Sequence, residues 1–222
     1  MAFGPIMRMK VGKLTIELAP IARKDLKEFV SPGMQQAVVT RFLGSSMAPV
    51  LEDEFDWFEK VRTQRDSIVW GIYNVAGEKR TVIGVTSATN IAHYCGVSST
   101  VTGSQIFRPE LWGKGIASAI HKARTWYLCQ HVGLHQINSG VMHGNTASSK
   151  ALEKVGYSPT YVQRNFKFVD GKLRHQQYLE CINPNEPFWS AWWGEDTPPK
   201  AALKARERSL EAFEWAKENV TL

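Results

Sequence analysis

The sequence has few cysteines and no long apolar run. Its 222 residues include three widely spaced cysteines, Cys95, Cys129 and Cys181, and no Cys-x-x-Cys pair. Such a scattered, odd set favours free thiols over a disulfide framework or a structural zinc site. No apolar stretch approaches the ~20 residues of a membrane-spanning helix, and basic residues interrupt any signal-peptide core near the N-terminus. We therefore expect a cytoplasmic protein that holds no metal and does not cross a membrane.

Repeats, low-complexity tracts and nucleic-acid-binding motifs are also missing. Hydrophobic residues make up 43% of the chain and charged residues 22%, which is typical of a soluble globular protein with a sizeable core. The net charge of +6 favours anionic partners, which include nucleic acid, a membrane surface and a polyphosphate cofactor. Because the basic residues are not interleaved with aromatic ones in a recognisable pattern, we do not expect nucleic acid to be the partner.

Apolar periodicity predicts strands and helices in alternation, and hence a layered α/β or α+β domain. The predicted strands cover residues 14–18, 67–75, 80–88, 101–107, 136–141, 158–168 and 172–181, and the predicted helices cover 23–30, 49–65, 115–131, 146–155 and 200–219. After Asn183 the composition changes to tryptophan and proline. The pattern therefore predicts one main domain over residues 1–183 and a C-terminal extension, with a terminal helix, over 184–222.

A glycine turn joins the strand that ends at Phe107 to the helix that follows. Gly113-Lys114-Gly115 stands directly before the first helical residue. Backbone N–H groups at a helix start are unpaired and lie at the positive end of the helix dipole, so this arrangement binds phosphate oxygens. Lys114 adds a positive charge. The alternative interpretation is an ordinary tight connection between a strand and a helix.

Two well-known phosphate-binding patterns do not fit this turn. The dinucleotide fingerprint G-x-G-x-x-G would need glycine at Ser118, and no mononucleotide P-loop pattern occurs. Instead, Trp112-Gly-Lys-Gly115-Ile-Ala117 resembles the [Arg/Gln]-x-x-Gly-x-[Gly/Ala] loop of the GNAT superfamily of acetyl-CoA-dependent N-acetyltransferases, although Trp112 departs from its first position. Downstream, Asn145-Thr-Ala-Ser148 and Leu152-Glu-Lys-Val-Gly156-Tyr157 resemble the branch that acetylates the N-termini of ribosomal proteins.

This resemblance covers about residues 12–183 and implies a fold and a cosubstrate. The fold is a mixed α+β domain with a central, splayed, mostly antiparallel sheet flanked by helices. Acetyl-CoA would lie in the splay between the strand ending at Phe107 and the strand near 137–141. The residues implied in its binding are Gln105, Ile106 and Phe107 along the pantetheine, Gly113, Lys114, Gly115, Ile116, Ala117 and Ser118 around the pyrophosphate, and Asn145. Asn145 also suits a helix N-cap.

The resemblance leaves the catalytic groups partly open. Many relatives carry a tyrosine that protonates the departing thiolate, but the equivalent position here is Leu152. In the ribosomal branch a serine serves instead, which makes Ser148 the candidate general acid. The glutamates that relatives use as bases correspond here to Gly140 and Lys167. A water relay, His93 and the acidic group 52–54 remain as alternatives for the base.

A backbone N–H near Ile106 or Phe107 is the expected donor to the oxyanion. We expect acetyl transfer to a primary amine, either a protein N-terminus or a small molecule. A non-catalytic acyl-CoA-binding module is the alternative. The aromatic tail, with Trp189, Trp192 and Trp193, could cap the acceptor cleft, form a homodimer contact or pack into the core.

Overall fold

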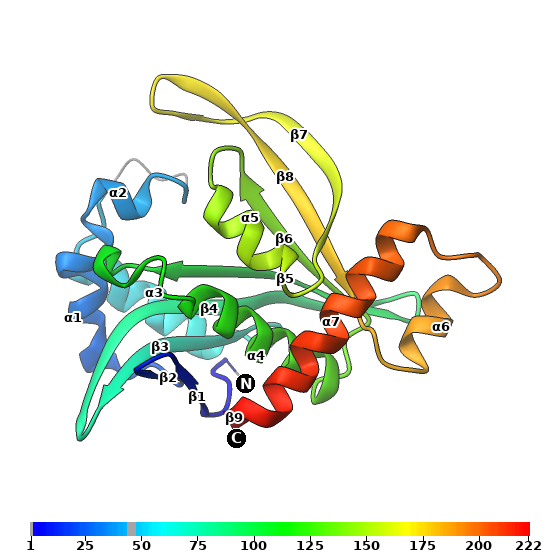
Figure 1. The fold of residues 1–222 in the computed structure, drawn as a ribbon. Coiled ribbons are helices and arrows are strands. Elements are labelled where there is room, and N and C mark those ends of the chain that lie inside the picture. The colour runs from blue at the N-terminus through cyan, green and yellow to red at the C-terminus, as the bar shows by residue number, and fades with distance from the viewer. Residues whose placement is uncertain (1, 44–47) are drawn as a thin grey trace.

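The computed structural model of the protein describes residues 2–43 and 48–222. Its centre is a nine-stranded sheet in the order β7-β8-β6-β5-β4-β3-β2-β1-β9 (Figure 1). The strands are β1 (Met7–Val11), β2 (Leu14–Ala19), β3 (Ile68–Ala76), β4 (Lys79–Tyr94), β5 (Val97–Ile106), β6 (Gln136–Met142), β7 (Ser158–Val169), β8 (Lys172–Ile182) and β9 (Val220–Thr221). With helices on both faces, this mixed architecture confirms the predicted fold class.

Neighbouring strands are antiparallel except for β5 and β6, which are parallel. Parallel neighbours need a crossover, and here the helix α4 (Ile116–Gln130) provides it. The β5–β6 ladder is short, because pairing runs only from Ser99↔Gln136 to Thr102↔Ser139. The C-terminal parts of both strands therefore diverge inside the sheet.

Helices cover the two faces of the sheet unequally. Besides α4, the helical segments of the described residues are η1 (Arg23–Asp25), α1 (Leu26–Glu28), η2 (Phe29–Met34), α2 (Ala37–Thr40), α3 (Leu51–Thr63), η3 (Pro109–Leu111), α5 (Thr146–Glu153), α6 (Phe188–Trp193) and α7 (Lys200–Asn219). The larger apolar core joins α4, α5 and α7 to the face that lies in front in Figure 1. A smaller core joins α1, α2 and α3 to the opposite face. None of the helices in the described residues is long and apolar enough to span a membrane.

The C-terminal extension is built into this fold. Its helix α7 has the predicted bounds and contributes Ala212, Phe213 and Ala216 to the larger core. The last strand, β9, pairs with β1 through Met9↔Val220, so both ends of the chain meet at one edge of the sheet. Trp189 is buried against Trp193 and Arg206, which belong to the same extension.

Some predicted boundaries differ from the structure. Strand β1 and helix α6 were not expected, and the helix expected over 23–30 is a broken series of short turns that reaches Met34. Ser31 is extended (φ −126°, ψ 125°) because the proline that follows it disfavours helical geometry. Cys129 and Cys181 are buried free thiols, and Cys95 is exposed.

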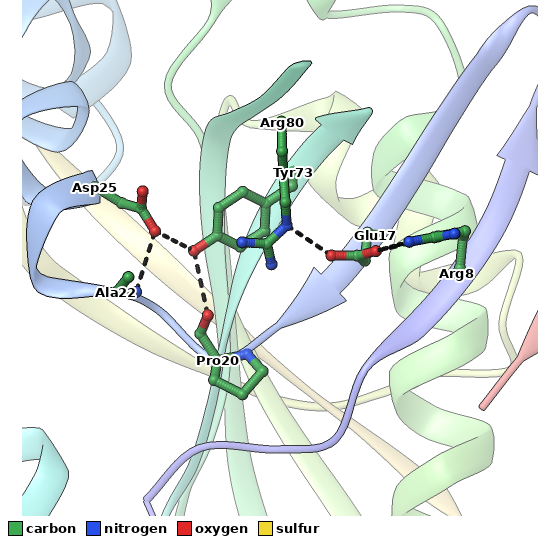
Figure 2. A network of polar contacts seen from close by, with 7 residues as sticks. All are labelled: Arg8, Glu17, Pro20, Ala22, Asp25, Tyr73 and Arg80. Atoms are coloured by element: carbon green, nitrogen blue, oxygen red, sulfur yellow. Dashed lines mark hydrogen bonds and ion pairs between the residues drawn. The ribbon is translucent and has the colours of Figure 1, made fainter. Parts of the chain in front are cut away.

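A polar network links side chains of the first four strands (Figure 2). Glu17 is 2% exposed and accepts hydrogen bonds from Arg8 (2.7 Å) and Arg80 (2.7 Å). Arg80 also lies over the ring of Tyr73, whose hydroxyl donates to Asp25 at 2.7 Å. Burial alone would raise the pKa of Glu17, but the two arginines outweigh it and hold the pKa below its usual value.

Candidate active site

The divergence of β5 and β6 leaves a stretch in the middle of the sheet where the two strands do not pair, and we call this gap in the pairing the groove. Its base is closed by two side-chain bonds: Thr102 Oγ1 donates to Asn138 O (3.1 Å), and Ser139 Oγ donates to Thr102 O (3.2 Å). Beyond this rung Gly103 and Gly140 are exposed, although both belong to inner strands. The groove therefore presents strand edges that another extended group can pair with.

Backbone directions along β5 determine which groups face the groove. Phe107 N–H donates to Ile83 O at 3.0 Å, on the side of β4. Because successive N–H groups of a strand point to opposite sides, the N–H of Ile106 points towards the groove. Of the two oxyanion donors expected, the N–H of Phe107 is thus already engaged. Its side chain is buried against Phe29, with ring centroids 5.0 Å apart.

The glycine turn lies where β5 leaves the groove. Gly113 (φ 74°) and Gly115 (φ 82°) are both left-handed, and Gly115 is the N-cap of α4. A Cβ on Gly113 would meet no atom within 4 Å, so open space surrounds the turn. Trp112 closes it against the strand, since its Nε1 donates to Ile106 O at 2.8 Å. The unpaired N–H groups of the first turn of α4 are therefore accessible to an anion.

Helix α5 follows β6 and borders the groove on its other side. Asn145 is its N-cap, and its Oδ1 accepts from Ser148 N–H at 3.3 Å, so the capping role holds. Ser148 shares a helix face with Leu152, which is buried in the larger core, so its hydroxyl is on the inward side of α5. The outward side lines a hollow of about 300 Å³ with the end of β6 and includes Lys150.

The structure separates the candidate bases. His93 pairs with Ser98, which is about 16 Å along β5 from Gly103, so His93 is remote from the groove. A side chain at Gly140 would collide with Gln176, whose Nε2 lies 2.5 Å from the ideal Cβ position. Within 52–54, Glu54 is buried; this burial, aided by the charge of Asp53, raises its pKa.

The β7–β8 hairpin forms a rim that reaches the N-terminal helices (Figure 1). At its tip Asp170 pairs with Arg41, which follows α2, at 2.6 Å. Lys167 lies opposite Arg174 in the hairpin, and Arg174 is 3.8 Å from Asp170. This rim thus carries three cations and one carboxylate near its tip.

A polar cluster beneath the groove, buried except for Ser104, was missed from the sequence. It consists of Thr86, Ser104, His121 and Arg124. One signal was available: Arg124 follows Ile120 by four residues, so it falls on the predicted apolar face of α4. No group of three or more His, Cys, Asp or Glu among residues 2–43 and 48–222 is arranged to hold a metal ion.

Comparison with known proteins identifies the family of this chain. A family profile described as an acetyltransferase (GNAT) domain matches residues 15–158. The chain belongs to the GNAT acetyltransferase family. A curated relative, the probable N-acetyltransferase YjcK of Bacillus subtilis (strain 168), is 31% identical over 74 residues. That match covers 33% of this chain and 41% of the relative, so it spans about two fifths of the relative's length.

Solved structures share the GNAT fold at low sequence identity. Spermidine N-acetyltransferase from Vibrio cholerae, in complex with CoA and spermine, superposes with a TM-score of 0.67 at 16% identity, covering 76% of this chain and 95% of that one. Mycobacterium smegmatis RimJ, in complex with CoA-disulfide, also gives 0.67, at 18% identity over 90% of this chain and 91% of that one.

Proposed function

We propose that this GNAT protein transfers the acetyl group of acetyl-CoA to a primary amine, on a small molecule or a protein N-terminus, by direct attack of the amine on the thioester. The observation that carries this proposal is the combination of an open groove between β5 and β6 with two left-handed glycines at the start of α4. The groove suits an extended arm, and the helix start suits a pyrophosphate. Acetyl-CoA has both parts.

In this proposal the amides of residues 113–118 and Lys114 hold the pyrophosphate. Gln105, Ile106 and Phe107 run along the pantetheine, and Asn145 contacts it from α5. The Ile106 N–H donates to the oxyanion, since the Phe107 N–H is engaged. A donor of this kind typically contributes ~3–4 kcal/mol to catalysis.

Two side chains are proposed for proton transfer. Ser148 gives a proton to the departing thiolate from the inward side of α5. Glu54 takes the proton of the attacking amine, directly or through water, because a carboxyl with a raised pKa accepts a proton more readily near neutral pH. A Glu54→Gln variant that retained the wild-type rate at neutral pH would remove Glu54 from this role.

The charge of the rim favours one kind of acceptor. Lys167, Arg174 and Arg41 outnumber Asp170, so a polyamine would be repelled there. We expect amines that also carry a carboxylate or phosphate, including acidic peptide N-termini, to react faster than spermidine. Cytoplasmic location and dimerisation stay predictions from the sequence.

The test is release of free thiol from acetyl-CoA in the presence of a panel of peptides, amino acids, aminoglycosides and polyamines. Gly115→Asp should weaken acetyl-CoA binding roughly 100-fold, because a carboxylate facing the pyrophosphate costs about 3 kcal/mol. Gly77→Asp is the matched control, since Gly77 is also left-handed (φ 59°) in open space but lies in the β3–β4 turn.

Each outcome has a definite meaning. Unchanged affinity of Gly115→Asp by calorimetry refutes the loop assignment. Tight acetyl-CoA binding without thiol release for any amine favours the non-catalytic acyl-CoA-binding module.

A further inference from the structure

A positive charge is buried beneath the base of the groove. Arg124, on α4, is 0% exposed, and its Nη1 donates to Thr86 Oγ1 (2.6 Å), Gly103 O (2.9 Å) and Ser104 Oγ (2.8 Å). Gly103 and Ser104 are the first residues of β5 beyond the last rung shared with β6. The guanidinium therefore lies directly under the point where the sheet opens.

No carboxylate neutralises this guanidinium. None of the ion pairs formed by residues 2–43 and 48–222 includes Arg124. His121 Nδ1 lies 3.1 Å from Arg124 Nη2 and must accept, because a guanidinium can only donate. Burial, and then the charge of Arg124, hold the pKa of His121 well below its usual value. Burial likewise raises the pKa of the nearby Tyr157, which stays a neutral phenol.

The two strands above Arg124 offer it only hydroxyl and carbonyl oxygens. A buried charge without a counter-ion costs several kcal/mol, and replacing such groups with apolar ones is often stabilising. The fold alone therefore gives little reason for an arginine here. A charge held at this cost beside a groove points to an anion that forms in the groove.

Ser104 connects the buried charge to the groove. Thr86 and Arg124 are 1% and 0% exposed, whereas Ser104 is exposed along the open edge of β5. Its Oγ accepts from Arg124 and lies 2.6 Å from Thr86 Oγ1, whose hydroxyl can donate to it as well. The Ser104 proton is then available to the groove, on a hydroxyl polarised by a full positive charge.

We propose that Arg124, acting through the Ser104 hydroxyl, stabilises the coenzyme A thiolate that leaves during acetyl transfer. This inference rests on the proposed function. As the amine nitrogen bonds to the carbonyl carbon and the C–S bond breaks, the electron pair passes to sulfur, and Ser104 donates a hydrogen bond to it without losing its proton. Ser104 is thus a catalytic residue and Arg124 a positioning residue.

The chemistry of the thiolate calls for such a charge. A thiol has a pKa of about 8.5, whereas a serine hydroxyl is a far weaker acid, so Ser148 alone would protonate the thiolate only with difficulty. A nearby cation lowers the energy of the thiolate until a proton arrives. Arg124 cannot lose its charge in a protein and so supplies this stabilisation at every working pH.

The test compares the affinities of the full-length protein for CoA and for acetyl-CoA between pH 6.5 and 9.5 by calorimetry. Both ligands carry the same phosphates, so their ratio isolates the ionisable thiol. If the site favours the thiolate, the bound thiol has a lower pKa than the free one, and CoA binding tightens relative to acetyl-CoA as the pH rises between these values. A shift of one unit gives about a tenfold change in the ratio.

Ser104→Ala should abolish this change in the ratio, as should Arg124→Met. Ser99→Ala is the matched control, because Ser99 belongs to the part of β5 that is paired with β6. Thermal denaturation identifies any variant that does not fold, and Ser104→Ala removes only one exposed hydroxyl. A merely structural Arg124 would not move the pKa of the ligand thiol.

A ratio that does not change with pH in the wild type, or that changes equally in Ser104→Ala, overturns the inference. If thiol is still released to an amine in that case, the proposed function stands without it. If the wild type binds no acetyl-CoA, the proposed function itself fails, and this inference fails with it.

Discussion

The backbone and the side chain of Ser148 have separate roles: the backbone N–H takes part in the cap of α5, and the hydroxyl is the proposed general acid. Its backbone N–H is capped by Asn145, and this bond persists whatever side chain stands at 148. Its hydroxyl, on the inward side of α5, has no such structural duty in the described part of the chain. The side chain can therefore be removed without loss of the cap, which makes its role separable by mutation.

Ser148→Ala should lower kcat roughly 100-fold and leave acetyl-CoA affinity within about twofold, because general acid catalysis typically contributes at least that much. Steady-state kinetics with the best amine of the panel, together with calorimetry, would measure both. Ser149→Ala is the control, since Ser149 lies on the outward side of the same helix. An unaltered kcat would take Ser148 out of the mechanism.

At the scale of elements, the network around Glu17 joins β1, β2 and β4. The Glu17 carboxylate, on β2, accepts from Arg8 of β1 and Arg80 of β4, so one carboxylate bridges three strands. Both arginines are partly exposed and regain water when Glu17 is neutralised. We therefore expect Glu17→Gln to lower the free energy of unfolding by about 1–3 kcal/mol at pH 7, less than for a wholly buried ion pair.

The pH dependence of stability follows from the lowered pKa of Glu17. Its contribution is fully present above the unfolded pKa and is lost as the pH falls through the lower folded value. Urea denaturation should thus show a smaller loss of stability between pH 5 and pH 3 in Glu17→Gln than in the wild type. Glu78→Gln, in the exposed β3–β4 turn, should behave as the wild type does.

The sequence predicted the elements that neighbouring residues determine, and missed those that depend on contacts between distant segments. Helix α4 was predicted from the spacing of its apolar residues, and the β7–β8 hairpin from its strand pattern and turn residues, because both signals lie in neighbouring residues. Strand β1 was missed because β2 and β9 define it, and β9 is over 200 residues away. The glycine turn is likewise local, whereas the Arg124 cluster joins α4 to β4 and β5 and needed the tertiary structure.

For the whole molecule, the C-terminal extension is a structural part of the acetyltransferase domain. Phe213 is 1% exposed and lies in the same core as α4 and β6. Phe213→Ala should lower the free energy of unfolding by about 3–5 kcal/mol, because it leaves a cavity in that core. Leu210→Ala, at a position 39% exposed on the same helix, should cost far less.

Thermal and urea denaturation would check this pair, and removal of residues 184–222 should leave a chain that does not fold. A stable chain of residues 1–183 with a cooperative transition would show instead that the extension is an independent addition.

The pairing of β1 with β9 also affects the order in which the chain folds during synthesis. On the ribosome, the first strand emerges more than 200 residues before its outer partner, so this sheet edge stays unsatisfied until residues 220–221 have been made. Closing so long a loop is slow compared with forming local hairpins. The nascent chain should therefore hold β1 open to chaperones, and become protease-resistant at this edge only when residues 220–221 have left the ribosome.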